Sequence, residues 1–112
     1  MPLDIWPLSG YNMARMKYNI TFAPIARDDF RSLSAYHRAE VRDAINSHLR
    51  YQPTRQSRSR IKRLRDMRKP QYRLRVGEIR VFYDVHGSEV EVLGIIDKGN
   101  AADWLKKWGE TP

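Results

Sequence analysis

The sequence predicts an α+β fold, a small antiparallel sheet of about four strands with a helical hairpin before it and a short helix after it. Residues 17–23 alternate in polarity like a half-buried strand, and two helix-like segments follow between residues 24 and 52. Three strand-like segments then come in succession between residues 71 and 97. The expected order is therefore β-α-α-β-β-β, followed by a terminal helix.

The first strand and the two helices have recognisable boundaries. In residues 17–23 the apolar side chains of Tyr18, Ile20 and Phe22 share one face. Pro24 suits the first turn of a helix, because its φ is preset and its missing N–H is not needed there. The second helix carries an apolar stripe, formed by Val41, Ala44, Ile45, His48 and Leu49, and stops at Pro53. Two helices joined this closely should form an antiparallel hairpin.

The next two strands meet at Gly77-Glu78, a two-residue loop with glycine first, which is typical of a type II′ hairpin turn. This loop sets the register and places Arg75 opposite Arg80. Because side chains alternate along a strand, one face should carry Arg73, Arg75, Arg80 and Phe82. The other face, directed to the core, should carry Leu74, Val76, Ile79 and Val81.

The pairing of Arg75 with Arg80 gives the sheet no benefit of its own. Like charges directly opposite in an antiparallel pair destabilise it by roughly 0.2–1 kcal/mol. A phosphate between them would convert the repulsion into charge-assisted contacts, and Phe82 beside them could stack a base. The alternative is a polar outer surface on which both guanidinium groups extend into water.

Positive charge is concentrated in one part of the chain. The formal net charge is +8, and residues 50–80 hold 12 Lys and Arg against 2 acids, a balance of +10. The other 9 bases and 11 acids give −2. This concentration predicts a polyanion partner, with a solvated basic loop as the alternative. The basic residues expected to bind nucleic acid ahead of the hairpin are Arg58, Arg60, Lys62, Arg63 and Arg65.

Several classes of protein are disfavoured by composition. The chain has no cysteine, so it has no disulfide or thiolate metal site, and we expect no metal and no cofactor. No apolar run approaches the roughly 18 residues of a membrane span, so we expect a cytoplasmic protein with no membrane contact. A glycine-rich phosphate loop, a nucleophile elbow and a carboxylate pair are all missing from the sequence.

The chain divides into a leader and one domain. Residues 1–15 show neither a helical nor a strand period and hold two prolines and a glycine. We expect them to be a poorly ordered leader, or the product of a start assigned too far upstream, with Met13 or Met16 as the true start. An arm docked on the domain is the alternative. Residues 16–112 suffice for a single small domain.

The segments Tyr72-Arg73-Leu74-Arg75-Val76-Gly77 and Arg80-Val81-Phe82-Tyr83 resemble the hairpin of the RelE/ParE superfamily, the toxins of bacterial type II toxin-antitoxin systems. Lys62-Arg63-Leu64 matches the Lys-x-Leu element that precedes this hairpin in the family. The resemblance extends from Lys17 to about Gly109 and implies a single toxin domain.

Several RelE-like members of this superfamily are ribosome-dependent mRNA endonucleases, in which a 2′-hydroxyl attacks the adjacent phosphate. Such a reaction needs charge stabilisation, a base and an acid. By resemblance, Arg73 and Arg75 fall where RelE-like nucleases carry basic strand residues, and Arg80 falls on the family's hairpin arginine. Their expected catalytic role is phosphate binding and charge stabilisation. The family often has Arg, His or Tyr after the last strand for proton transfer. Here Lys98 is the basic residue available as acid or electrostatic partner, and Trp104 could stack a base. For Lys98 the alternative is a solvated lysine near the start of a helix.

ParE-like members share the hairpin but inhibit DNA gyrase through protein contacts, so the resemblance leaves two activities open. A non-catalytic basic module that binds nucleic acid is a third possibility. The partners implied are a cognate antitoxin together with the ribosome and mRNA, or DNA gyrase in the second case.

Overall fold

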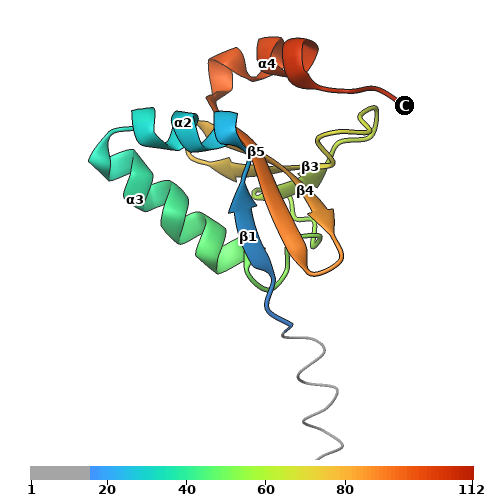
Figure 1. Ribbon diagram of the computed structural model, residues 1–112, viewed down its shortest axis with the longest axis horizontal. Coiled ribbons are helices and arrows are strands. Elements are labelled where there is room, and N and C mark those ends of the chain that lie inside the picture. The colour runs from blue at the N-terminus through green and yellow to red at the C-terminus, as the bar shows by residue number, and fades with distance from the viewer. Residues whose placement is uncertain (1–15) are drawn as a thin grey trace, which may run out of the picture.

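The structure, a computed structural model, describes residues 16–112, and the leader expected at residues 1–15 lies outside this part (Figure 1). One five-stranded sheet has the order β1-β5-β4-β3-β2. Its strands are β1 (Asn19–Phe22), β2 (Ile61–Arg63), β3 (Tyr72–Val76), β4 (Ile79–His86) and β5 (Glu89–Asp97). The helices are α2 (Pro24–Ser32), α3 (Ala35–Ala44) and α4 (Ala101–Trp108). A π turn, η1 (Ile45–Leu49), continues α3, and a 3₁₀ turn, η2 (Lys98–Asn100), precedes α4.

The predicted α+β class is confirmed, and the sheet differs from the expectation in two details. A fifth strand, β2, pairs antiparallel with β3, placing Ile61 opposite Leu74. It spans three residues, which is too short to show a period in the sequence. In addition, β1 runs parallel to β5. Because the helical hairpin separates β1 from the other strands, no tight turn constrains its direction.

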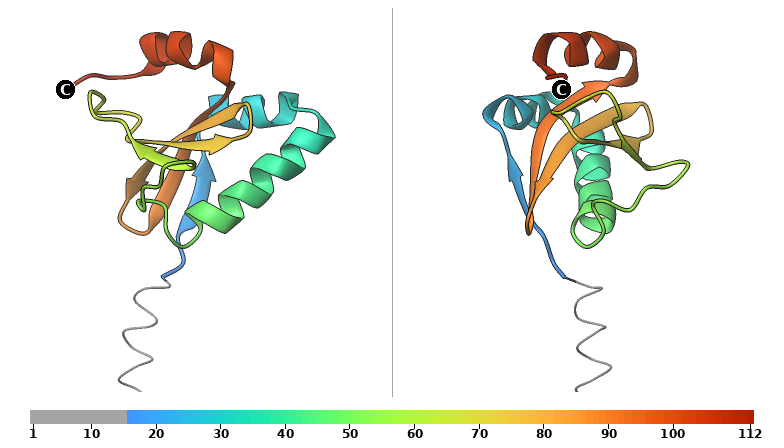
Figure 2. Two further views of the ribbon diagram at one scale, coloured as in Figure 1. Left: turned by 180° about the vertical axis from the view of Figure 1, so that it is seen from behind. Right: turned by 90° about the vertical axis from the view of Figure 1, so that its right-hand side faces the viewer.

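The main core lies between the sheet and the two N-terminal helices. α2 and α3 lie along one side of the sheet, whereas α4 lies across its end (Figures 1 and 2). The core side of the β3–β4 hairpin is as predicted, with Leu74, Val76, Ile79 and Val81 all buried beside Ala26, Val41 and Leu49 from the helical hairpin. A second, smaller cluster on the other face joins Phe82 and Leu93 to Trp104 of α4.

In the part of the chain that the structure describes, no helix is long and apolar enough to cross a membrane. Within the same residues, no group of three or more His, Asp or Glu side chains is placed to hold a metal ion.

Candidate active site on the arginine face

The β3–β4 hairpin has the predicted register. Arg75 lies opposite Arg80, and Arg73 lies opposite Phe82. Gly77 has φ +58°, whereas Glu78 is outside the left-handed region, as a type II′ turn requires. Since directly opposed residues of an antiparallel pair point to the same face, the three arginines share the face turned away from α2 and α3.

The short strand β2 enlarges this basic surface. Lys62 lies opposite Arg73, so its side chain belongs to the same face. The backbone N–H of Arg75 donates to the carbonyl of Arg60 at 2.9 Å. This bond extends the contact between β2 and β3 to the residue that precedes β2. We call Lys62, Arg73, Arg75 and Arg80 the arginine face. It is assembled by three strands, of which the sequence revealed two.

The three arginines are held differently. Arg80 is only 7% exposed, and its Nη1 donates to the carbonyls of Gly77 at 2.8 Å and Ile79 at 3.1 Å, so it braces the turn. Arg75 is exposed. Arg73 is half-buried, and its buried Nε has no hydrogen-bond partner within residues 16–112. Arg75 and the unpartnered Arg73 are therefore the groups best placed to receive an anion.

The charge on Arg73 is not compensated. Burial, followed by the charges of Arg80 and Arg75, lowers the pKa of the Arg73 guanidinium. None of the ion pairs among the described residues involves these three arginines. A concentration of like charge that the fold leaves unpaired is typical of a functional anion site, because a bound phosphate would remove the repulsion.

Replacing Arg73 with methionine is expected to raise the free energy of unfolding by about 0.2–1 kcal/mol. A pKa that is lower in the folded state means that the charged guanidinium opposes folding, while methionine keeps much of the aliphatic stem. Urea unfolding measures the change, and Arg58→Met, at an exposed position, is the control with little effect. A loss of stability on Arg73→Met would show that the guanidinium is structural instead.

Phe82 and Trp104 do not offer free ring faces, which corrects their expected role in base stacking. Their rings stack on each other with centroids 4.9 Å apart and an interplanar angle of 9°. Phe82 is 1% exposed and Trp104 9%. Phe82 does lie on the face that the alternation predicted, but α4 covers it. Gly94 makes this possible, because its lack of a side chain leaves room for the indole.

Lys98 lies next to the hairpin turn and is exposed. Its backbone N–H donates to the carbonyl of Glu78 at 2.7 Å, which ties η2 to the turn. Ile79 pairs with Asp97, so the last residue of β5 lies beside the first residue of β4, which precedes Arg80. Lys98 follows Asp97 and therefore lies at the end of the sheet that holds the hairpin turn and Arg80.

The basic residues ahead of the hairpin divide into two groups. Arg58, Arg60, Lys62 and Arg65 are exposed, as a backbone-binding role requires. Arg63 is half-buried, and its Nη1 donates to the carbonyls of Leu64 at 2.9 Å and Gln71 at 2.7 Å. Its guanidinium also lies over the ring of Tyr72, 5.4 Å from the centroid. Arg63 therefore has a structural role that the charge pattern alone did not reveal.

His48 should make stability depend on pH. It lines a polar pocket with Arg60, and burial, then the charge of Arg60, lowers its pKa below the ordinary value of 6.5. At a pH between the lowered pKa of the folded state and the ordinary value, the unfolded state binds more protons than the folded state. The free energy of unfolding should therefore fall as the pH drops below about 6.5. Urea unfolding at about pH 7.5 and about pH 5.5 tests this against His48→Gln, which retains His37 and His86. An identical pH dependence in the two proteins would contradict it.

The fold and the basic hairpin define a small α+β domain with a candidate anion site, and comparison with known proteins makes the fold more specific. No protein-family model and no curated protein matches the chain. A chain of the RelBE2 toxin-antitoxin complex from Mycobacterium tuberculosis does, with a TM-score of 0.63 and 24% identity over 73% of this chain and 99% of that one.

Two archaeal structures are similar as well. The RelE-RelB complex from Pyrococcus horikoshii matches with a TM-score of 0.54 and 20% identity, over 75% of this chain and 98% of that one. The RelB-RelE complex from Methanococcus jannaschii matches with a TM-score of 0.57 and 18% identity, over 75% of this chain and 96% of that one. The protein thus has the fold of the RelE toxins, and the resemblance indicated by its hairpin motif is confirmed at the level of the fold.

Proposed function

We propose that this protein is the toxin of a type II toxin-antitoxin pair and that it inhibits translation by cleaving ribosome-bound mRNA. The observation that carries the proposal is the arginine face, where Arg75 lies opposite Arg80 with Arg73 beside them and no carboxylate among the described residues pairs with any of the three. The fold shared with chains of three toxin-antitoxin complexes supports the same class.

The proposed reaction is a transesterification within the RNA. The 2′-oxygen of one nucleotide bonds to the adjacent phosphorus and loses its proton, while the bond to the 5′-oxygen of the next nucleotide breaks and that oxygen gains a proton. The products are a 2′,3′-cyclic phosphate and a 5′-hydroxyl. Negative charge accumulates on the phosphorane, and preorganised guanidinium donors such as Arg73 and Arg75 stabilise it.

Proton transfer needs other groups, because arginine does not readily release its proton. We assign Lys98 as the acid or electrostatic partner near the leaving oxygen, since it lies at the same end of the sheet as Arg80. Arg80, fixed by its bonds to the turn, would position the phosphate. The partner that restrains the toxin would be a cognate antitoxin, as in the complexes with the same fold.

The decisive experiment compares two targets in parallel. End-labelled mRNA on purified ribosomes is expected to be cut, whereas the same mRNA without ribosomes is not, and DNA supercoiling by gyrase is expected to be unaffected. Inhibition of gyrase without mRNA cleavage would establish the ParE-like alternative. RNA binding with neither effect would establish a non-catalytic module.

A further inference from the structure

A polar pocket lies at the end of α3, between η1 and the loop that leads into β2. Its volume is about 320 Å³, near the lower end of the range for ligand pockets, roughly 300–1,000 Å³. We call it the loop pocket, and it is lined by Ser47, His48, Gln52, Arg55, Ser57, Ser59, Arg60 and Ile61. None of these described residues is an Asp or Glu, so two guanidinium groups give the pocket an uncompensated positive charge.

The π turn η1 (Ile45–Leu49) forms one wall of the loop pocket and supplies Ser47 and His48. The sequence predicted His48 on the apolar stripe of a regular helix. Ile45 and Leu49 of this stripe are buried in the core, whereas His48 is half-buried and lines the polar pocket. Single π turns within helices are rare and occur frequently at functional sites. The irregular turn is therefore a second indication of a site, independent of the charge.

The loop that forms the other wall is fixed at both ends. The hydroxyl of Tyr83, which is buried in the core, donates to the carbonyl of Pro53 at 2.6 Å. The backbone N–H of Ser57 donates to the carbonyl of Ile61 at 3.0 Å. Residues 53–61 therefore present their side chains to the pocket in a defined arrangement.

The side chains of the loop pocket leave hydrogen-bond donors free for a ligand. Arg55 Nη1 donates to Gln52 Oε1 at 3.2 Å, and its other donors have no partner among the described residues. Arg60 Nη1 makes one long bond, to the carbonyl of Arg75 at 3.4 Å. Ser57 Oγ accepts the backbone N–H of Arg60 at 3.1 Å, so its own proton remains available. None of the ion pairs in the described chain involves either arginine of the pocket.

His48 adds a group that can respond to a bound anion. Burial, then the charge of Arg60, lowers the pKa of its imidazole. The other charged side chain that lines the pocket is Arg55, which is also positive. An anion bound beside the ring would offset these charges and raise the pKa of His48. The imidazolium would then donate from both nitrogens, so the pocket can increase its own positive charge when a ligand binds.

The loop pocket and the arginine face lie on opposite sides of β2. Ile61 lines the pocket, whereas Lys62, the next residue, belongs to the arginine face. Successive side chains of a strand point to opposite faces. Since β2 is the last strand of the sheet on its side, the pocket lies around this edge from the arginines of the hairpin. Each site can therefore bind its own anion.

We propose that the loop pocket binds the dianionic phosphate of a phosphomonoester. Its two guanidinium groups match two negative charges, and three terminal oxygens can accept from them and from the hydroxyls of Ser47, Ser57 and Ser59. A phosphodiester has one charge and two terminal oxygens, so it would leave part of this donor set unpaired. The phosphate belongs to a small nucleotide or to the phosphorylated end of an RNA. The inference does not rest on the proposed function.

Isothermal titration calorimetry of the full chain with uridine 5′-monophosphate tests the site. Arg55→Gln should weaken binding about tenfold or more, because it removes a charge-assisted donor. The matched control, Arg58→Gln, removes the same charge from the same loop and should bind like the wild type, because Arg58 is exposed and does not line the pocket. Circular dichroism verifies that both variants are folded. Equal binding by wild type and Arg55→Gln would overturn the proposal.

A second variant excludes the arginine face as the place of binding. Arg73→Gln/Arg75→Gln leaves the loop pocket intact and should bind uridine 5′-monophosphate like the wild type. Loss of binding in this variant would assign the phosphate to the arginine face, and the proposal would be wrong.

Two RNA probes, used with Arg73→Gln/Arg75→Gln, distinguish a monoester from a diester. An RNA of about four nucleotides with a 5′-phosphate should bind at least tenfold more tightly than the same RNA with a 5′-hydroxyl, which has only diesters. Equal binding of the two would contradict a phosphomonoester site. Tighter binding of the phosphorylated RNA than of uridine 5′-monophosphate would support the site and identify an RNA end as its ligand. Equal binding of these two would support the site and identify a small nucleotide.

The histidine rings provide a readout inside the pocket. In an NMR titration, saturation with sulfate, which stays a dianion over the titration range, should raise the pKa of His48. His37 and His86 do not line the pocket and should titrate as before. A His48 pKa that does not change while sulfate binds would show that the anion lies elsewhere.

Discussion

Replacing Arg73 and Arg75 together with glutamine is expected to lower the rate of ribosome-dependent mRNA cleavage by about 10³-fold or more. Arg75 is exposed, and Arg73 has a buried Nε without a partner in the described chain, so both can turn toward a phosphate. Glutamine keeps a donor at each position but removes the charge that would stabilise the phosphorane. Cleavage of end-labelled mRNA under single-turnover conditions measures the effect.

A matched variant, Lys106→Gln/Lys107→Gln, removes two charges from α4 and should cleave at the wild-type rate. Lysine at both hairpin positions should retain only part of the activity, because an ammonium group carries the charge but cannot bind a phosphate in the bidentate manner. Arg80 is left in place, since it bonds the turn and its loss would confuse folding with catalysis. Full cleavage by the double glutamine variant would exclude the arginine face as the active site.

The hairpin register was predictable because every determinant of it is local. Gly77-Glu78 selects the turn, the turn sets the opposition of Arg75 and Arg80, and alternation assigns each side chain to a face. The same reasoning identified the core side of both strands. The candidate site could therefore be located in the sequence as a pair of like charges that strand pairing alone would disfavour.

Features that depend on contacts distant in sequence were not predictable. β2 has only three residues, and it becomes a strand because β3 supplies an edge for it. The parallel pairing of β1 with β5 joins residues about seventy positions apart. Phe82 was placed on the correct face, but no local pattern indicates that α4 returns to cover it.

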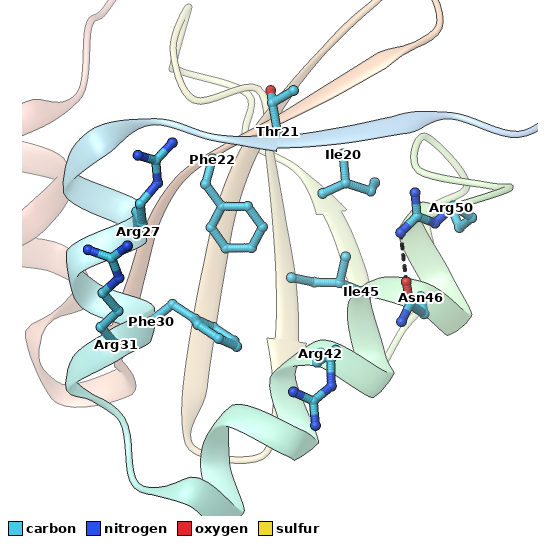
Figure 3. A pocket seen from close by; sticks show the side chains of 10 residues that line it. All are labelled: Ile20, Thr21, Phe22, Arg27, Phe30, Arg31, Arg42, Ile45, Asn46 and Arg50. Atoms are coloured by element: carbon cyan, nitrogen blue, oxygen red, sulfur yellow. Dashed lines mark hydrogen bonds between the residues drawn. The ribbon is translucent and has the colours of Figure 1, made fainter.

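Three arginines that line a pocket beside β1, α2 and α3 were overlooked for a related reason. Arg27, Arg31 and Arg42 belong to a part of the chain whose acids and bases nearly balance, so no charge run marks them. They line the same pocket because α2 and α3 fold back beside β1 (Figure 3). Charge counting along the sequence drew attention to residues 50–80 and not to these three arginines.

Gly94→Ala is expected to lower the free energy of unfolding by about 1–3 kcal/mol. A Cβ at this position would lie 2.6 Å from Cε2 of Trp104 and closer still to Cζ2, which is well inside van der Waals contact. The indole is stacked on Phe82 and cannot move away without losing that contact. Urea unfolding measures the loss, and the near-UV circular dichroism of the stacked rings should weaken with it.

A double-mutant cycle separates this clash from the intrinsic effect of alanine in a strand. Trp104→Ala alone should lower the free energy of unfolding by about 3 kcal/mol, because it removes the indole from the cluster formed with Phe82 and Leu93. In that background Gly94→Ala has no indole to displace, so its cost should fall to a few tenths of a kcal/mol, roughly the level of independent sites. If the losses of unfolding free energy in the two single variants simply add in the double variant, other contacts hold α4 in place. The burial of Phe82 would then not depend on the glycine.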